Sequence, residues 1–118
     1  MISDFPDSTT LLENARKEKL YLKLIVQIQK DFLLANITFG VKTDMTIGDL
    51  KGLLHEKIYL LIMERFDSYL NLLYVIDVPE KAFKEIEVTD AVEVSKQVSF
   101  LILKRELQKI LLKEKYSS

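Results

Sequence analysis

The sequence predicts an α+β fold, in which a mixed sheet of four to five strands is crossed by one long helix and followed by a short C-terminal helix. Three observations predict it. Apolar and polar residues alternate along residues 20–29, with the period of a half-buried strand. Apolar residues recur at helical spacing after Thr46. A run rich in aliphatic and β-branched residues, 98–103, then has the composition of a strand.

The chain divides into three parts. Residues 1–19 form a polar lead-in, in which Asp7 or Ser8 is suited to cap a short helix. Residues 20–105 form the α+β domain, and residues 106–118 form a helical extension. A chain of 118 residues has the length of one domain.

The first two strands are expected to form a hairpin. Residues 20–29 form the first strand and residues 32–42 form the second, which also alternates. Lys30 and Asp31 separate the two apolar runs and suit the corner.

The central helix has the sharpest start signal. The Thr46 hydroxyl can accept a hydrogen bond from a free backbone N–H, and Asp49 favours the positive end of the helix. The helix is expected to begin at Ile47 and to extend about 20 residues. Its apolar positions are Ile47, Leu50, Leu53, Leu54, Ile58, Leu61, Ile62 and Phe66. We expect Leu50, Leu54 and Ile58 to be buried. Their expected neighbours are Leu24, Val26 and either Leu101 or Leu103.

The second half of the chain supplies the remaining strands. Residues 69–78 are apolar and end at Pro79, which favours a third strand. The acidic connection that follows has room for a short strand near residues 83–88. Residues 98–103 form the last strand, and the apolar residues of 107–112 mark the terminal helix.

Composition excludes several function classes. Because cysteine is absent, disulfides, thiolate zinc sites and cysteine nucleophiles are excluded. A net charge of −1 gives no global attraction to nucleic acid or anionic membranes. No apolar run approaches the ~20 residues that span a bilayer, and the N-terminus has no secretory apolar core. We therefore expect an intracellular protein, cytoplasmic or nuclear.

The helix start and the last strand resemble the ubiquitin-like (β-grasp) domain family. The helix of that family opens with a threonine, an aliphatic residue, two mostly polar residues, an aliphatic residue and a lysine. The corresponding residues here are Thr46-Ile47-Gly48-Asp49-Leu50-Lys51. The closing segment of the family corresponds to Asp90, Val92 or Val94, residues 95–97 and residues 98–103. The resemblance implies that the first and last strands are parallel neighbours.

A narrower likeness is to the ubiquitin-like subunit of the minor spliceosome's di-snRNP. It rests on Asp49-Leu50-Lys51 and Val98-Ser99-Phe100. Ubiquitin and its conjugated relatives end in a di-glycine, whereas this chain ends in Ser117-Ser118 and holds no glycine pair. A modifier function is therefore the weaker alternative.

No residue set has the pattern of an active site, a cofactor site or a metal site. His55 is the single histidine, and its neighbours lack the spacing of a metal site or of an acid–base pair. The acids Glu85, Glu87, Asp90 and Glu93 lack the glycine and spacing of a calcium loop. We assign no catalytic, cofactor or metal residues and expect no small-molecule substrate.

The candidate contact residues are apolar side chains in excess of what a one-sided helix needs. The predicted partner-binding residues are Tyr59, Leu60, Met63, Leu107, Ile110 and Leu111. Whether the terminal stripe packs on its own domain or on a partner stays open, with a slight preference for a partner. A basic run near the C-terminus supplies candidate phosphate contacts, namely Lys104, Arg105, Lys109 and Lys113.

These observations predict a non-enzymatic, ubiquitin-like protein-interaction module, a small subunit of a larger protein or ribonucleoprotein assembly. The alternative is an RNA-contacting spliceosomal subunit that uses the basic run.

Overall fold

The chain folds into helices alone. The computed structural model describes residues 5–116, and within them there are six helices and no strand. The helices are α1 (Ser8–Lys17), α2 (Tyr21–Leu34), α3 (Ile47–Glu64), α4 (Phe66–Ile76), α5 (Glu80–Phe83) and α6 (Ala91–Tyr116). The predicted α+β fold is therefore wrong. The ubiquitin-like, β-grasp resemblance and its narrower likeness to the di-snRNP subunit are wrong with it, because both require a sheet.

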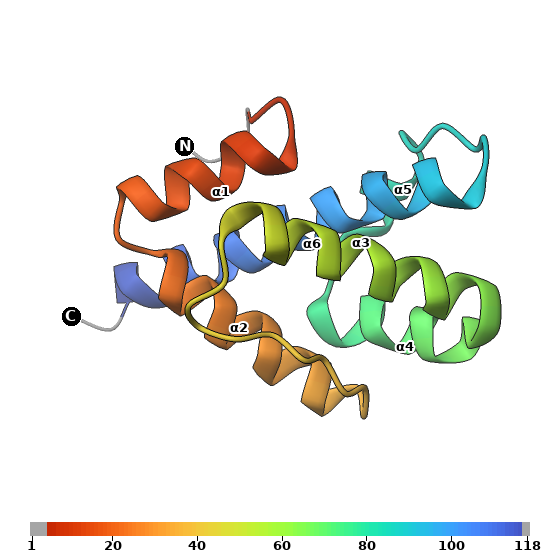
Figure 1. Cartoon of the computed structure of the whole chain (residues 1–118), viewed down its shortest axis with the longest axis horizontal. Coiled ribbons are helices and arrows are strands. Elements are labelled where there is room, and N and C mark those ends of the chain that lie inside the picture. The colour runs from red at the N-terminus through yellow and green to blue at the C-terminus, as the bar shows by residue number, and fades with distance from the viewer. Residues whose placement is uncertain (1–4, 117–118) are drawn as a thin grey trace.

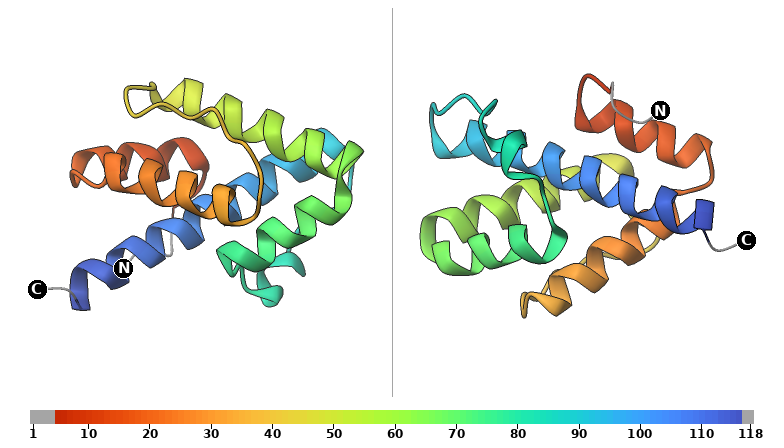
Figure 2. Two further views of the ribbon diagram at one scale, coloured as in Figure 1. Left: turned by 90° about the horizontal axis from the view of Figure 1, so that it is seen from below. Right: turned by 180° about the vertical axis from the view of Figure 1, so that it is seen from behind.

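Helix α6 is the axis of the bundle. It contacts α1, α2, α3 and α4, which surround it (Figures 1 and 2). Helices α3 and α4 follow one another through Arg65 and fold back as a hairpin. The molecule measures 40 × 27 × 26 Å along its principal axes. Within residues 5–116, no helix combines the length and the apolarity that crossing a membrane requires.

The first predicted strand, 20–29, lies in α2. Its alternating leucines fit a period of two, but residues 21–32 also carry an apolar set at helical spacing, namely Tyr21, Leu24, Ile25, Ile28 and Phe32. Those five residues are buried. Leu22 and Val26, which alternation would have buried, are about half exposed. The helical face buries the larger, contiguous apolar set, so the helix is favoured.

The second predicted strand, 32–42, is divided between the end of α2 and an irregular connection. Its alternation is present in the structure, since Ile37, Phe39 and Val41 are buried while the residues between them are exposed. Phe39 stacks on Phe32, with ring centroids 4.4 Å apart. The segment is covered by helices and pairs with no other strand, so the predicted hairpin does not form.

The two later strands are also helical. Residues 69–78 belong mostly to α4, which buries Tyr69, Leu72, Leu73 and Ile76 at spacings of three and four. Residues 98–103 lie in the middle of α6, and the predicted short terminal helix is the last part of the same 26-residue helix. The short strand predicted near 83–88 is the end of α5 and a loop.

The predicted start of the central helix is confirmed. Thr46 Oγ1 accepts a hydrogen bond from the Asp49 backbone N–H at 3.1 Å, and α3 begins at Ile47. Leu50, Leu54 and Ile58 are fully buried, as predicted. Asp7 caps α1 in the same way, accepting from the Thr10 N–H at 2.8 Å. The apolar face of α1, Leu11, Leu12 and Ala15, is completely buried, so this helix is part of the core.

Candidate functional site

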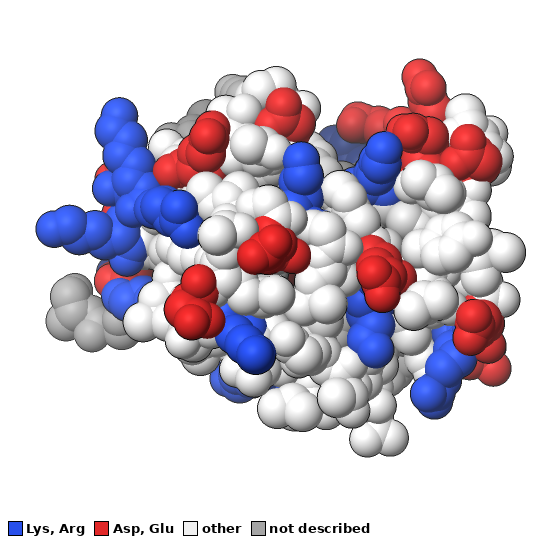
Figure 3. Space-filling model, in the orientation of Figure 1, with Lys and Arg blue, Asp and Glu red and all other residues white. Residues whose placement is uncertain are grey.

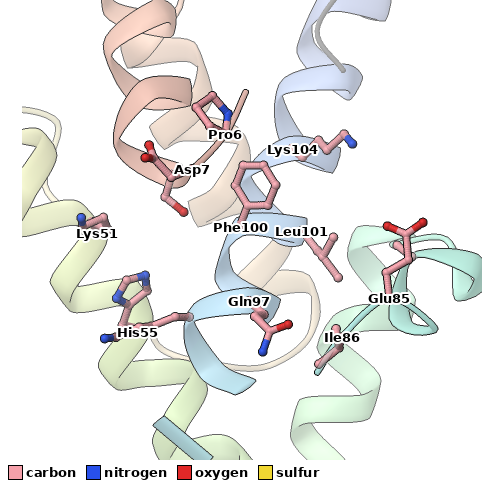
Figure 4. A pocket seen from close by; sticks show the side chains of 13 residues that line it. Pro6, Asp7, Lys51, His55, Glu85, Ile86, Gln97, Phe100, Leu101 and Lys104 are labelled. Atoms are coloured by element: carbon pink, nitrogen blue, oxygen red, sulfur yellow. The ribbon is translucent and has the colours of Figure 1, made fainter. Parts of the chain in front are cut away.

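A pocket of about 440 Å³ opens between α1, α3, α6 and the segment after α5 (Figure 4). The start of α1 contributes Asp7 and Ser8, and α3 contributes Lys51 and His55. Helix α6 contributes one face of side chains, which are Lys96, Gln97, Phe100, Leu101 and Lys104. Four separate elements therefore form this pocket, and no short sequence motif could have indicated it.

One side of the pocket is cationic. Lys51 Nζ donates a hydrogen bond to Thr9 Oγ1 at 2.8 Å, which places its ammonium beside the start of α1. His55 is half-buried, and its Nε2 atom is buried without a hydrogen-bond partner. Burial, reinforced by the positive charges of Lys51 and Lys96, lowers the pKa of His55, so that the imidazole is neutral at pH 7.

The opposite side is apolar and held in place. Phe100, Leu101 and Ile86 supply apolar surface. In Figure 4 the Phe100 ring lies between Pro6, before α1, and Gln97 on α6. The Gln97 side chain accepts from the Glu87 N–H at 2.9 Å and donates to the Glu87 carbonyl at 3.0 Å. This pair of bonds fixes the loop after α5 against α6 and so defines the wall of the pocket.

A second polar cluster is closed inside the bundle. Lys109 Nζ lies 2.5 Å from Asp31 Oδ2 and donates to the Ile76 carbonyl at 3.1 Å, so it joins α6, α2 and α4. Gln27 also donates to Asp31 Oδ2, at 3.2 Å, and accepts from Lys113 at 2.7 Å. Asp31 is buried, which opposes its ionisation, but these hydrogen bonds together hold its pKa below the ordinary value.

Glu106 completes this cluster and is completely buried. Lys109 Nζ lies 3.1 Å from its Oε1, yet the geometry makes no hydrogen bond to either carboxyl oxygen. Burial and the neighbouring Asp31 carboxylate raise the pKa of Glu106 to about 9. The protonated side chain can donate to Asp31, which leaves Asp31 as the carboxylate that faces the Lys109 ammonium. Its position between three helices gives it a structural role.

The predicted partner-binding residues separate into two groups. Leu60 and Met63 are exposed on α3, and Tyr59 is partly buried beside a groove between α3 and the start of α6. Leu107 and Ile110 are buried in the core of the bundle, and Leu111 is partly buried. In this structure the terminal stripe therefore packs on its own domain, and a partner has no access to Leu107 or Ile110.

An exposed apolar row lies on α4, and the sequence pattern did not predict it. Phe66, Leu70 and Tyr74 lie one turn apart and are all exposed, Tyr74 by 84%. Their spacing of four was the available signal, but it was hidden by the assignment of this stretch as a strand. We call the exposed residues at the end of α3 and along α4 the α4 surface; they are Leu60, Met63, Phe66, Leu70 and Tyr74.

The candidate phosphate contacts do not share one surface. Lys109 is engaged in the buried cluster, and Lys113 donates to Gln27. Arg105 pairs with Asp77 at 3.0 Å, and Lys104 lines the pocket. Charge is nevertheless polarised along the molecule. Lysine and arginine gather at the end where α1 and α6 finish, and acids gather by the loop between α5 and α6 (Figure 3).

Among residues 5–116, no three histidine, aspartate or glutamate side chains are placed to hold a metal ion. The chain matches no family model, no curated protein and no solved structure. Function must therefore be argued from the surfaces themselves.

Proposed function

We propose that this protein is a non-enzymatic protein-interaction module, a small subunit of a larger assembly, that binds a basic amphipathic helix of a partner on its α4 surface. The observation that carries the proposal is the exposed row on α4. The opposite face of that helix already packs in the core through Tyr69, Leu72, Leu73 and Ile76. A surface helix that is also apolar on its outer face is typical of a binding site.

The α4 surface extends beyond one helix. Leu60 and Met63 lie on the last two turns of α3, immediately before α4. On the other side, the Asn71 amide donates to the Ala35 carbonyl at 3.3 Å, so the end of α2 lies beside α4. That end exposes Leu33 and Leu34. The apolar area thus spans neighbouring elements and suits a helix laid across them.

Charge selects the class of partner helix. Glu64 and Asp67 are exposed next to the apolar row, and Arg65 is the cation between them. Helix α5, the loop after it and the first turn of α6 carry further exposed acids, namely Glu80, Glu85, Glu87, Asp90 and Glu93. An acidic border favours a partner with lysine or arginine beside its apolar stripe, and charge complementarity also speeds association. The large side chains Phe66 and Tyr74 are of the kinds that act as binding anchors.

The test uses a designed amphipathic helical peptide of leucine and lysine, and a second peptide in which glutamate replaces each lysine. Binding is measured by fluorescence anisotropy on the full chain. We expect the lysine peptide to bind more tightly, and Leu70→Ser to weaken it by about tenfold or more. The matched control is Leu22→Ser, since Leu22 is 55% exposed on α2 and Leu70 is 49% exposed.

Three results would overturn the proposal. Equal binding of the two peptides would remove the charge argument. Equal loss in the Leu22 and Leu70 variants would show that the contact is unspecific or lies on α2. Concentration-dependent self-association that is abolished by Leu70→Ser would show that a second copy, and not a partner helix, covers this surface.

A further inference from the structure

We propose that the outer face of α2 binds the surface of an anionic phospholipid membrane, with its apolar row in the interface and its lysines at the lipid headgroups. The inference does not depend on the proposed interaction function. It adds a site of attachment to a lipid surface, which differs in chemistry from a binding site for a partner helix.

The outer face of α2 is apolar and basic. The opposite face packs in the core, and the one acid of this helix, Asp31, is buried and paired with Lys109. The exposed side chains are four aliphatic residues, two lysines and a glutamine, namely Leu22, Val26, Leu33, Leu34, Lys23, Lys30 and Gln29. We call these seven residues the α2 surface. An exposed helix face that is largely apolar is typical of a contact surface.

The apolar and basic residues form two rows along the helix. Leu22, Val26 and Leu33 follow one another at spacings of four and seven, so they lie along one line, and all three are at least half exposed. Lys23 and Lys30 are seven positions apart and flank that line on one side. Helices that lie in the plane of a membrane interface have this pattern, because their aliphatic groups enter the acyl boundary while the ammonium groups reach the headgroups.

The contacts of the two lysines leave them accessible to headgroups. Lys113 and Glu114 of α6 line the same hollow as the first half of the α2 surface. Glu114 forms an ion pair with Lys23, so it offsets one lysine, but both side chains are about half exposed and a surface pair of this kind is weak. Among residues 5–116, no ion pair involves Lys30.

The charge around α2 changes along its length. Near its start, where α1 and α6 finish, the other exposed cations are Arg16, Lys17, Lys19, Lys42, Lys113 and Lys115, and the exposed acids are Glu13, Glu18, Asp44, Asp49 and Glu114. Together with Lys23 and Lys30, cations outnumber acids there, although the net charge of the chain is −1 (Figures 1 and 3). Near the other end of α2, Glu64 and Asp67 border the α4 surface. The first half of α2 is therefore the part that faces the lipid.

The residue types of this face favour a lipid surface over a protein or a nucleic acid. Its exposed residues include no aromatic side chain and no arginine, the types that most often anchor protein interfaces, and lysine is depleted in such interfaces. A nucleic acid would leave the aliphatic row in water and would find no ring for base stacking on this face. An anionic membrane uses both rows. The α4 surface differs, because it presents Phe66 and Tyr74.

The experiment is co-sedimentation of the full chain with phospholipid vesicles, either of phosphatidylcholine alone or with added phosphatidylserine. We expect the phosphatidylserine vesicles to bind at least about tenfold more tightly, and high salt to weaken this binding. Val26→Asp should weaken it about tenfold, because it places a carboxylate in the apolar row. Leu70→Asp is the matched control and should leave the affinity unchanged. Leu70 is 49% exposed on α4 and Val26 is 50% exposed, and both variants change the net charge equally.

A second pair of variants tests the lysine row. Lys30→Glu should weaken binding to the phosphatidylserine vesicles by about tenfold, because it replaces an attraction to the headgroups by a repulsion. Lys84→Glu, at an exposed position directly after α5, changes the net charge equally and should leave the affinity unchanged. Circular dichroism checks that each variant is folded.

Four results would contradict the proposal. The first two are absence of binding to phosphatidylserine vesicles and equal binding to neutral ones. Equal losses within either pair of variants would show that total charge, and not the α2 surface, controls binding. An oligouridylate that binds the natural protein without vesicle binding, and is released by Lys30→Glu, would assign this face to nucleic acid. None of these results changes the peptide test of the α4 surface.

Discussion

Lys109 Nζ lies 2.5 Å from Asp31 Oδ2, a contact between α6 and α2 that spans 78 positions of the sequence. Both side chains are largely removed from solvent. Because the same ammonium also donates to the Ile76 carbonyl on α4, one charge connects three helices. A buried ion pair of this kind contributes less to stability than the removal of one partner costs, because the remaining charge then stays buried without a partner.

Lys109→Met should therefore destabilise the fold by about 3–5 kcal/mol. It leaves the Asp31 carboxylate without its ammonium, and it leaves the Ile76 carbonyl without this donor. Urea unfolding followed by circular dichroism measures the change. Lys115→Met is the control, because Lys115 is exposed and its replacement should cost at most about 0.5 kcal/mol. Similar costs for the two variants would show that the cluster is not energetically important.

The pKa of Glu106 predicts a pH dependence with a definite sign. The folded protein retains a proton up to about pH 9, whereas the unfolded chain releases it above the ordinary glutamate value of 4.5. The native state binds more protons between these values, so the free energy of unfolding should fall as pH rises from about 7 to 8.5. The window avoids His55, whose lowered pKa makes stability rise with pH below this range. It also avoids Asp31, whose contribution is lost only under acidic conditions.

The variant that checks this assignment is Glu106→Gln, which resembles the protonated side chain and cannot ionise. Its free energy of unfolding should change less with pH than that of the natural protein over the same window. Glu80→Gln, at an exposed position, should keep the natural slope. A Glu106→Gln variant with an unchanged slope would show that Glu106 is ionised in the folded state.

The sequence predicted the starts of α1 and α3 correctly because the capping signal is local. Thr46 and Asp49 determine the cap of α3 through neighbouring backbone groups, whatever the rest of the chain does. Strand and helix could not be separated for residues 20–29, because leucine, isoleucine and valine occupy both periods there. Only the other helices decide which face of that segment is covered, and period alone cannot show that.

Helix ends were hidden for a different reason. Lys19, Asn36 and Asp77 have positive φ angles next to the ends of α1, α2 and α4, positions where glycine is the usual residue. No glycine has a positive φ angle among the described residues. Without a glycine to mark the end of α2, Lys30 and Asp31 resemble a hairpin corner in the sequence, although they lie within α2.

The candidate pocket was beyond sequence reasoning. His55 stands out in the sequence as the single histidine, but its position near Lys96 depends on how α3 packs against α6. The two residues are 41 positions apart in the sequence, and only the tertiary fold brings them into the lining of one pocket. The excess of apolar residues around Tyr59 and Met63 is visible in the sequence, whereas its continuation along α4 depends on that segment being a helix.

Core packing provides a test of α3. Leu54→Ala should cost about 2–5 kcal/mol, since Leu54 is completely buried and its truncation leaves a cavity. Leu60→Ala on the same helix is the matched control, because that leucine is 39% exposed and should cost much less. Thermal unfolding of both variants measures the difference. If Leu60→Ala costs as much as Leu54→Ala, then the buried face of α3 is assigned wrongly.

The end of α1 offers a stabilising substitution. Lys19 has a φ of 61°, and its N–H donates to the Arg16 carbonyl at 3.0 Å, while the Leu20 N–H donates to the Ala15 carbonyl at 2.7 Å. These two bonds form the helix-ending motif in which the left-handed position suits glycine. A left-handed conformation costs a residue with a Cβ roughly 1–2 kcal/mol, part of which glycine loses again through its greater freedom in the unfolded chain.

Lys19→Gly should therefore stabilise the fold by about 0.5–1 kcal/mol. The exposed Lys19 side chain contributes little to offset this gain. Asn36→Gly is the informative comparison, because Asn36 occupies the same position after α2, with a φ of 62°. Asparagine tolerates this conformation better than lysine does, so the gain there should be smaller. Melting temperatures of the two variants rank the effects, and a destabilised Lys19→Gly protein would mean that α1 does not end in this motif in solution.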